Sequence, residues 1–190
     1  MNKFVFVDRD GVINEYPGDG NYVVKKEDFH IIPGAAAAIA KLKSAGFKIF
    51  VISNQACVSK GLIKKEDLMN MTAAFLSYFD QQKAFIDGVY YCIHTQEEAC
   101  SFRKPSPKMV FEIYRQNNIK PQENKILSYF IGDSIIDIKT ARAAGCRSVL
   151  VLSGREKKER EPYWEEKPDY ISDSLLTAAD LIIDSNTKDV

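Results

Sequence analysis

Short apolar runs alternate with longer amphipathic stretches along the chain. Five of these runs are rich in β-branched and aromatic residues, end in polar residues, and predict strands at 4–7, 48–52, 88–91, 128–131 and 148–152. Apolar positions at helical spacing predict helices at about 34–45, 65–82, 106–118, 135–144 and 173–183. This alternation of strands and helices is typical of an α/β fold built around a mostly parallel sheet.

The same pattern predicts one domain rather than several. We find no repeat, no low-complexity tract and no linker, and we expect a single domain over 1–184 followed by a flexible tail over 185–190. The charged segment 155–167 is expected to be a solvated loop or a short helix. A chain of 190 residues can bury roughly 70% of the surface that it exposes when unfolded. Folding therefore requires neither a disulfide nor a metal.

Composition narrows the possible partners. The 26 basic and 26 acidic side chains balance, which argues against a nucleic-acid partner and against a polybasic membrane anchor. Two aspartates within the first ten residues leave no room for a signal peptide, and no later run is long enough to span a membrane. Four dispersed cysteines do not make a disulfide framework. We expect a cytoplasmic monomer that takes a small ligand.

Two aspartates follow the first predicted strand, in the sequence Asp8-Arg9-Asp10-Gly11. Strand alternation turns Asp8 and Asp10 the same way, and Gly11 lets the backbone approach a ligand closely. Neighbouring carboxylates favour a hard divalent cation such as Mg²⁺, and a carboxylate beside such a cation can act as a nucleophile. Taken alone, this segment is more typical of a strand end followed by a turn cap.

Polar and basic side chains follow in two further segments. Ser53, Asn54 and Gln55 end the second strand and could hold phosphoryl oxygens through a hydroxyl, amides and backbone N–H groups. Further along the chain, Lys104 could neutralise a phosphoryl group, and the guanidinium of Arg103 could grip a second anion. Each segment also has an ordinary explanation, namely turn-forming residues in the first and surface cations in the second.

Two more carboxylates follow the fourth predicted strand. Asp133 comes directly after that strand, and the four-residue spacing places Asp137 on the same side of the strand-to-helix junction. They could bind a metal or orient Lys104, although helix capping by Asp133 is the simpler explanation of this segment alone.

Four motifs have now been described, namely Asp8-Arg9-Asp10-Gly11, the segment 53–55, the segment 103–104 and the pair Asp133 and Asp137. In this order, and in their strand contexts, these four motifs resemble those of the haloacid dehalogenase (HAD) superfamily. The resemblance covers about residues 3–183. It extends to the branch that contains the heptose 1,7-bisphosphate phosphatases and the histidinol-phosphate phosphatases, through segments 8–14, 22–23, 53–55, 87–94, 103–105 and 132–134. It implies a Rossmann-like, HAD-type three-layer sandwich without a large cap domain.

The resemblance also implies roles for individual residues in phosphomonoester hydrolysis. Asp8 would be the nucleophile that forms an aspartyl-phosphate, and Asp10 would be the general acid and base. Asp8, the backbone carbonyl of Asp10, and Asp133 would bind Mg²⁺. The remaining roles are stabilisation of the phosphoryl group by Ser53 and Lys104, and substrate binding by Asp19, Gly20, Asn21, Tyr22, Asn54, Gln55 and Arg103.

A second metal site is incomplete. Relatives in this branch carry a zinc loop of the form C-x-H, a spacer and C-x-C before R-K-P. Here Cys92, His94 and Cys100 match, whereas Phe102 stands in place of the last cysteine. Since structural zinc normally takes four protein ligands, we expect weak zinc binding at most, and we expect packing by Phe102 and Phe111 to order the loop. Alternatively, the three residues are ordinary loop thiols and an imidazole.

The motifs leave the substrate open. A heptose 1,7-bisphosphate that loses its 7-phosphate would offer its second phosphate to Arg103 and Lys60. Histidinol phosphate is the alternative, because the five-residue spacer between His94 and Cys100 also suits that relative. A non-catalytic sugar-phosphate-binding module would not need both Asp8 and Asp10. A nucleic-acid 3′-phosphatase would share the motifs but would be expected to carry a basic stripe.

Overall fold

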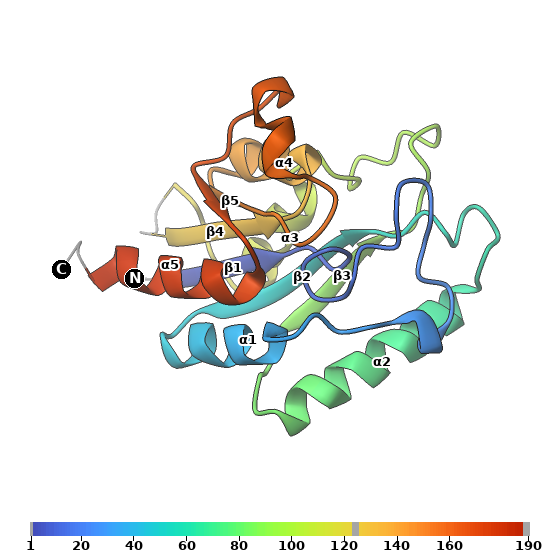
Figure 1. Cartoon of the computed structure of the whole chain (residues 1–190), viewed down its shortest axis with the longest axis horizontal. Coiled ribbons are helices and arrows are strands. Elements are labelled where there is room, and N and C mark those ends of the chain that lie inside the picture. The colour runs from blue at the N-terminus through green and yellow to red at the C-terminus, as the bar shows by residue number, and fades with distance from the viewer. Residues whose placement is uncertain (1, 123–125, 188–190) are drawn as a thin grey trace.

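The structure, a computed structural model, describes residues 2–122 and 126–187. A six-stranded, wholly parallel sheet in the order β3-β2-β1-β4-β5-β6 forms its centre. Helices cover both faces of this sheet (Figure 1). The strands are β1 (Asn2–Val7), β2 (Lys48–Asn54), β3 (Gly88–Cys92), β4 (Ile126–Gly132), β5 (Arg147–Val151) and β6 (Tyr170–Ser172). The α-helices are α1 (Ala35–Ser44), α2 (Lys65–Gln81), α3 (Lys108–Gln116), α4 (Ile135–Ala144) and α5 (Leu175–Thr187), with short 3₁₀ helices at Lys26–Asp28 and Lys158–Tyr163.

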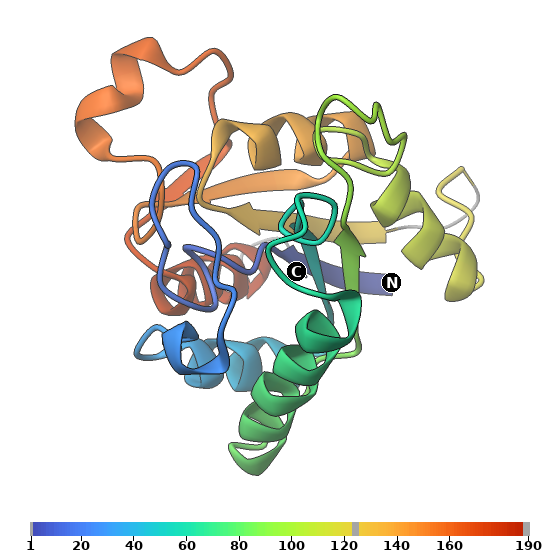
Figure 2. The same cartoon turned by 90° about the vertical axis from the view of Figure 1, so that its right-hand side faces the viewer.

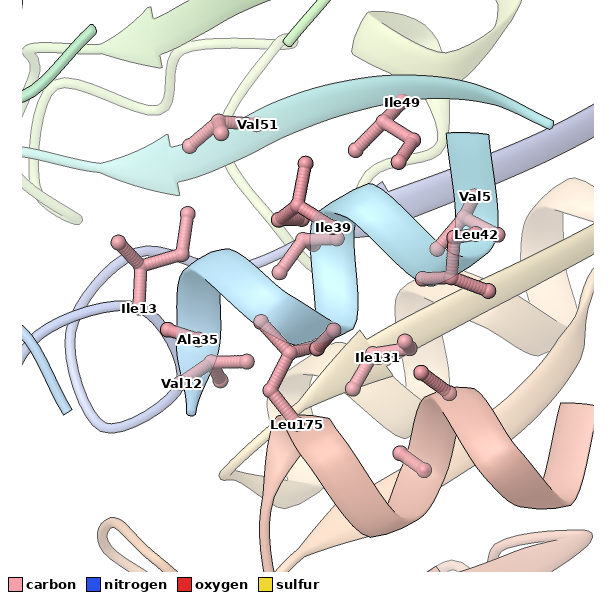
Figure 3. Close-up of a cluster of buried hydrophobic side chains, with 14 of the residues drawn as sticks. Val5, Val12, Ile13, Ala35, Ile39, Leu42, Ile49, Val51, Ile131 and Leu175 are labelled. Carbon is pink, nitrogen blue, oxygen red and sulfur yellow. The ribbon is translucent and has the colours of Figure 1, made fainter. Parts of the chain in front are cut away.

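The two faces of β1 belong to different cores, which confirms the three-layer sandwich. Val5 and Val7 pack with residues of α1, α2 and α5, whereas Phe4 and Phe6 pack with residues of α3. Figure 3 shows the first core, where Ile39 and Leu42 of α1 lie against the sheet. In Figure 2, α1, α2 and α5 (blue, green and red) lie on one side of the sheet, and α3 and α4 (yellow-green and orange) lie on the other. Among the described residues, no helix is long and apolar enough to cross a membrane.

The strand order determines where a ligand can bind. The chain proceeds from β1 through β2 to β3 on one side, and β4 then returns to pair with the other edge of β1. A parallel α/β sheet has its ligand crevice where the strand order reverses, outside the carboxyl ends of the strands. That point lies between the ends of β1 and β4. It brings the segments after Val7 and Gly132 together, although 125 positions separate these two residues along the chain.

Two sequence-based predictions differ from the structure at the C-terminal end. The three-residue strand β6 is absent from the predicted strands, because so short a segment at the sheet edge shows no hydrophobic period. The final helix also reaches Thr187, so residues 185–187 of the predicted flexible tail are helical. Residues 188–190 of that prediction lie outside the described residues. The segment 155–167 forms loops and one 3₁₀ helix, as predicted.

Asp169 attaches the β6 segment to the start of β5. Its Oδ2 accepts hydrogen bonds from the backbone N–H and the hydroxyl of Ser148, each at 2.7 Å. Partial burial alone would raise the pKa of Asp169, but these hydrogen bonds, with Arg142 and Arg147 nearby, hold that pKa below its ordinary value. A carboxyl whose pKa falls on folding stabilises the protein above its unfolded pKa, and this contribution is lost as the pH falls.

We therefore expect Asp169→Ala to lower the free energy of unfolding at pH 7 by about 1 kcal/mol, as measured by urea denaturation. The difference from wild type should shrink as the pH falls below about 4. Asp173→Ala, at an exposed position, is the matched control and should change stability by less than about 0.5 kcal/mol. Equal losses in the two variants would contradict this role for Asp169.

Candidate active site

Segments that follow β1, β2 and β4 meet in one cleft of about 310 Å³ at the carboxyl edge of the sheet. The loop before α3 and the loop 16–22 close its sides. The cleft brings together the predicted site residues of the four motifs, apart from the buried Gln55 and Asp137. Its lining includes Asp8, Asp10, Asp19, Gly20, Asn21, Tyr22, Ser53, Asn54, Arg103, Lys104 and Asp133.

Lys104 is a buried cation between two carboxylates. Its Nζ lies 2.9 Å from Asp8 Oδ1 and 2.6 Å from Asp137 Oδ1, and it donates a hydrogen bond to the carbonyl of Ile52 at 3.1 Å. Burial alone would lower the pKa of Lys104, but the charges of Asp137 and Asp8 raise it overall. The ammonium is therefore held charged at the floor of the cleft.

Asp137 orients Lys104 and also caps α4. While its Oδ1 meets Lys104, its Oδ2 accepts hydrogen bonds from the hydroxyl of Ser134 at 2.6 Å and from the Ser134 backbone N–H at 3.2 Å. Asp137 is fully buried, and both of its oxygens are in use. Of the two roles left open by the sequence, metal ligand or orienting group, these contacts favour the orienting group.

Asp8 and Asp133 form a buried acidic pair that suits a divalent cation. One oxygen each of Asp8, Asp133 and Asp137 lies within 4.8 Å of the others. Burial raises the pKa of Asp8 to about 6 against the pull of Lys104, and burial together with the charge of Asp8 raises that of Asp133. Despite its ion pair with Lys104, Asp8 Oδ1 accepts no well-directed hydrogen bond from the described residues. The carboxylate oxygens are hard donors, Asp8 Oδ1 lacks a hydrogen bond, and the buried carboxylates repel one another. All three features fit Mg²⁺.

Two glycines make room for Asp133. A Cβ built on either Gly11 or Gly154 would lie 2.1 Å from Asp133 Oδ2, so any side chain at these positions would displace the carboxylate. Asp133 Oδ2 also accepts a hydrogen bond from the backbone N–H of Arg155 at 2.7 Å. The hydroxyl of Ser153 donates to the Gly11 carbonyl at 2.7 Å and joins the loops after β1 and β5. Asp133 is thus fixed by backbone on both sides.

Asp10 accepts hydrogen bonds from three neighbouring side chains, of which Arg9 and Asn14 were not predicted as site residues. Its Oδ1 accepts hydrogen bonds from Arg9 and Asn14, and its Oδ2 accepts from Arg9 and Gln55. The prediction that Gln55 contacts substrate is wrong, because its side chain is fully buried and donates to Asp10 at 2.8 Å and to Ser53 at 3.1 Å. Gln55 instead supports two residues that line the cleft.

Asn54 faces the cleft but has a structural task there. Its amide donates to the backbone carbonyl of Lys104 and accepts from the backbone N–H of the same residue, both at 3.1 Å. This pair of hydrogen bonds joins the end of β2 to the loop before α3. Asn54 thus holds the backbone of Lys104 in place at the edge of the cleft, and its substrate-binding role stays a prediction.

The outer wall of the cleft contains two arginines. Arg103 donates to the carbonyl of His94 at 2.8 Å. Opposite it, Arg155 pairs with Asp19 at 3.1 Å, and the Tyr16 hydroxyl donates to the same carboxylate at 2.6 Å, which holds the pKa of Asp19 below its ordinary value. Arg155 lies in the charged segment 155–167, which was predicted only as a solvated loop or short helix. Nothing in the sequence distinguished Arg155 from the other charged residues of that segment. Lys60 lies over the Tyr22 ring, 5.1 Å from its centre, and does not line the cleft.

A larger hollow of about 530 Å³ lies on the other side of the loop 16–22. Glu15, Asp28 and His30 are the titratable side chains that it adds to those of the loop itself. It includes none of the carboxylates or the lysine at the strand ends, so its size does not make it the reaction site.

Cys92, His94 and Cys100 come together beside the cleft. Their ligand atoms lie within 4.8 Å of one another, and Cys92 Sγ is 3.9 Å from His94 Nδ1. These donors fit zinc in type but are three rather than four. Phe102 and Phe111 are 43% and 44% exposed, so the prediction that their packing orders the loop is wrong. Polar contacts, such as that of Arg103 with the His94 carbonyl, and partial burial of Cys100 hold the loop instead.

We expect dialysed wild-type protein, purified without chelator, to retain clearly less than one zinc per chain by elemental analysis. Phe102→Cys supplies the missing thiolate at an exposed position, and we expect it to raise zinc affinity on the order of 100-fold or more. Ser101→Cys adds a thiol at the wrong spacing and serves as the control. Stoichiometric zinc in the wild type would contradict the expectation.

Comparison with known proteins gives consistent matches. Residues 101–178 match the family described as HAD-hyrolase-like. The chain is 30% identical over 187 residues to D-glycero-beta-D-manno-heptose-1,7-bisphosphate 7-phosphatase of Neisseria meningitidis serogroup B, covering 97% of each chain. It is 32% identical over 184 residues to D-glycero-D-manno-heptose-1,7-bisphosphate 7-phosphatase of Chlorobaculum tepidum, covering 93% of this chain and 92% of the relative.

A solved structure has a closely similar fold. The D,D-heptose 1,7-bisphosphate phosphatase from B. bronchiseptica, complexed with magnesium and phosphate, superposes with a TM-score of 0.86 at 25% identity, covering 96% of this chain and 99% of that one. The likeness therefore extends well beyond the four motifs.

Proposed function

The chain belongs to the D-glycero-D-manno-heptose-1,7-bisphosphate 7-phosphatase family of HAD-like hydrolases, and from this premise we propose its reaction. We infer that it removes the 7-phosphate of D-glycero-D-manno-heptose 1,7-bisphosphate with Mg²⁺, through an aspartyl-phosphate on Asp8. The observation that carries this proposal is the buried pair Asp8 and Asp133 beside the charged Lys104, with Asp10 at the same edge of the cleft. A binding module would gain nothing from this costly arrangement of carboxylates.

The reaction proceeds in two displacements at phosphorus. In the first, an oxygen of Asp8 bonds to the phosphorus, the bond to the sugar oxygen breaks, and Asp10 gives that oxygen its proton. In the second, Asp10 takes a proton from water, the water oxygen bonds to phosphorus, and the bond to Asp8 breaks to release phosphate. Both carboxylates line the cleft, whereas the side chain of Arg9, which separates them in the sequence, is buried and does not line it.

Charge stabilisation accounts for most of the expected rate enhancement. Lys104 and the hydroxyl of Ser53 face the position of the phosphoryl oxygens at the floor of the cleft. Asp8, the backbone carbonyl of Asp10, and Asp133 would hold Mg²⁺. When bound, the cation neutralises phosphoryl charge and lets one anion approach another.

Arg103 is suited to the second phosphate of the substrate, because it lines the cleft and donates its hydrogen bond to the His94 carbonyl rather than to a carboxylate. We expect Arg103→Ala to lower kcat/KM for the bisphosphate about 10- to 100-fold, chiefly through KM. For the corresponding 7-monophosphate, Arg103→Ala should lower kcat/KM less than about 3-fold. Equal losses with the two substrates would exclude recognition of the second phosphate by Arg103.

A phosphate-release assay with Mg²⁺ tests the function. The panel contains the heptose bisphosphate, hexose phosphates, histidinol phosphate and nucleotides, with Asp8→Asn as the control. The heptose bisphosphate should be hydrolysed with the highest kcat/KM, and nuclear magnetic resonance should show loss of the 7-phosphate. Preference for histidinol phosphate would overturn the proposed substrate but not the mechanism. Activity that survives Asp8→Asn would overturn the mechanism.

A further inference from the structure

Arg9 is a buried cation that stands, in the sequence, between the two catalytic aspartates of the first motif. It is only 1% exposed and is among the largest fully buried side chains of the protein. Its guanidinium lies between two rings, 5.5 Å from the centre of Phe29 and 5.9 Å from that of Tyr91. Burying a guanidinium costs several kcal/mol, a cost that is offset only when the charge is well paired. Such a residue calls for a role that an apolar side chain would not fill.

The charge of Arg9 is directed at Asp10. Within residues 2–122 and 126–187, the salt bridge of Arg9 is with the carboxylate of Asp10. Its Nε and one terminal nitrogen reach Asp10 Oδ1 at 3.1 and 2.8 Å, and the same terminal nitrogen reaches Oδ2 at 3.0 Å. A planar guanidinium that contacts both oxygens fixes the plane of the carboxylate as well as its place.

Two amides complete the set of donors around Asp10. Asn14 donates to Oδ1 at 2.9 Å, and Gln55 donates to Oδ2 at 2.8 Å. The backbone carbonyl of Arg9 also accepts the N–H groups of Val12, Ile13 and Asn14, so the turn that follows Asp10 is tied to Arg9. Any residue at position 9 would supply that carbonyl, so what depends on the arginine itself is the orientation of the Asp10 side chain.

The position of Arg9 is itself set by distant elements. Phe29 follows the 3₁₀ helix Lys26–Asp28, and Tyr91 belongs to β3. The Tyr91 hydroxyl is 2.9 Å from the hydroxyl of Thr72 on α2, which fixes that ring. Contacts from these separate elements leave the guanidinium little freedom to turn away.

We propose that Arg9 is a positioning residue for Asp10: it holds the carboxylate in the orientation from which Asp10 delivers its proton to the leaving sugar oxygen. Arg9 is buried and does not line the cleft, so it would act through Asp10 rather than on the substrate. The inference rests on the proposed phosphatase function and adds to it the residue that makes proton delivery efficient. A proton donor misplaced by about 1 Å can lose about 100-fold in rate.

The leaving group provides a test that loss of stability cannot imitate. A sugar alkoxide is a poor leaving group and needs the proton, whereas p-nitrophenolate leaves without one. We expect Arg9→Met to lower kcat/KM about 100-fold for the sugar phosphate and less than about 3-fold for p-nitrophenyl phosphate. Asp10→Asn should show the same selectivity at larger amplitude. Arg9→Lys, which keeps the charge but not the fork, should recover only part of the loss.

A second perturbation keeps the buried charge pair intact. Gln55→Leu removes the amide donor to Asp10 Oδ2 and should lower kcat/KM about 10-fold for the sugar phosphate alone. This variant carries the test if Arg9→Met does not yield folded protein. Tyr114→Phe, in the core on the opposite face of the sheet, is the control for general destabilisation and should leave the ratio of the two kcat/KM values unchanged.

Equal losses with the two leaving groups, or unchanged sugar-phosphate turnover in Arg9→Met and Gln55→Leu, would overturn the inference. The test uses whichever alkyl phosphate the wild type hydrolyses. Rejection of the heptose bisphosphate in favour of another alkyl phosphate would therefore overturn the substrate proposal alone. A wild-type enzyme that hydrolyses no alkyl phosphate would overturn both.

Discussion

Asp8→Asn is expected to lower phosphate release from the preferred substrate on the order of 10⁴-fold or more. The neutral amide cannot attack phosphorus, and it removes one of the two carboxylates suited to Mg²⁺. Steady-state phosphate release measures the loss. Asp180→Asn, which changes an exposed ion pair with Lys41, is the matched control and should retain full activity. Substantial activity in Asp8→Asn would exclude Asp8 as the nucleophile.

The same variant is expected to fold well without metal. Burial raises the pKa of Asp8 to about 6, so ionisation of Asp8 weakens the metal-free wild type as the pH rises from about 4 to about 6. Asp8→Asn removes this penalty, while Lys104 keeps Asp137 as its partner. We expect the metal-free variant to be at least as stable as wild type at pH 8, and its gain in Tm on addition of Mg²⁺ to be mostly lost. If Mg²⁺ raised the Tm of Asp8→Asn as much as it raises the Tm of the wild type, this result would contradict the assigned metal ligands.

Lys104→Met is expected to cost about 3–5 kcal/mol of unfolding free energy and about 10³-fold in kcat/KM. The buried ammonium lies 2.9 Å from Asp8 and 2.6 Å from Asp137, and its removal leaves both carboxylates without their cation. Urea denaturation of the metal-free protein measures the stability, and phosphate release measures the activity. A loss of activity without any loss of stability would show that Lys104 does not balance the buried acidic charge.

A double-mutant cycle separates charge balance from packing. In the Asp137→Asn background, Lys104→Met should destabilise the protein clearly less than in the wild type, because it then leaves one unpaired buried carboxylate instead of two. Lys108→Met, at an exposed position on the first turn of α3, is the control, and its effect should be the same in both backgrounds. Additive effects of Lys104→Met and Asp137→Asn would exclude coupling between the two groups.

The main elements follow from local pattern because each strand and helix is long enough to show its period. The strand from Asn2 to Val7 illustrates this, because its four buried residues, 4–7, end directly at the acidic motif that begins with Asp8. The strand β6 and the helical residues 185–187 were missed, because three-residue strands and helix ends depend on contacts with neighbouring elements. Asp169, which ties β6 to β5, acts across 21 positions of sequence.

The residues of the site likewise divide into those that local sequence predicts and those that tertiary contacts place. Asp8, Asp10 and Asp133 could be identified from sequence, since each follows a strand that must end at the same edge of a parallel sheet. Lys104, in the loop before α3, was identified from its place in the order of the motifs. Gln55 was assigned to substrate from its residue type in the second motif and from the family resemblance, yet it lies just beyond the end of β2 with its buried amide donating to Asp10. Phe102 was expected to be packed because it is apolar, but the loop leaves it exposed.

Local sequence pattern is thus sufficient for the α/β class, the parallel sheet and the acidic edge, because hydrophobic periodicity and strand ends are properties of neighbouring residues. Only the folded chain shows that Asp137 holds Lys104, that Arg155 meets Asp19, and that the charge of Arg9 is directed at Asp10 and away from Asp8. The first two contacts join residues far apart along the chain. The third depends on two rings, one beyond the 3₁₀ helix and one on β3, that enclose the guanidinium. Burial is what makes these pairings specific, because a charge removed from water must be matched by the group that the fold places beside it.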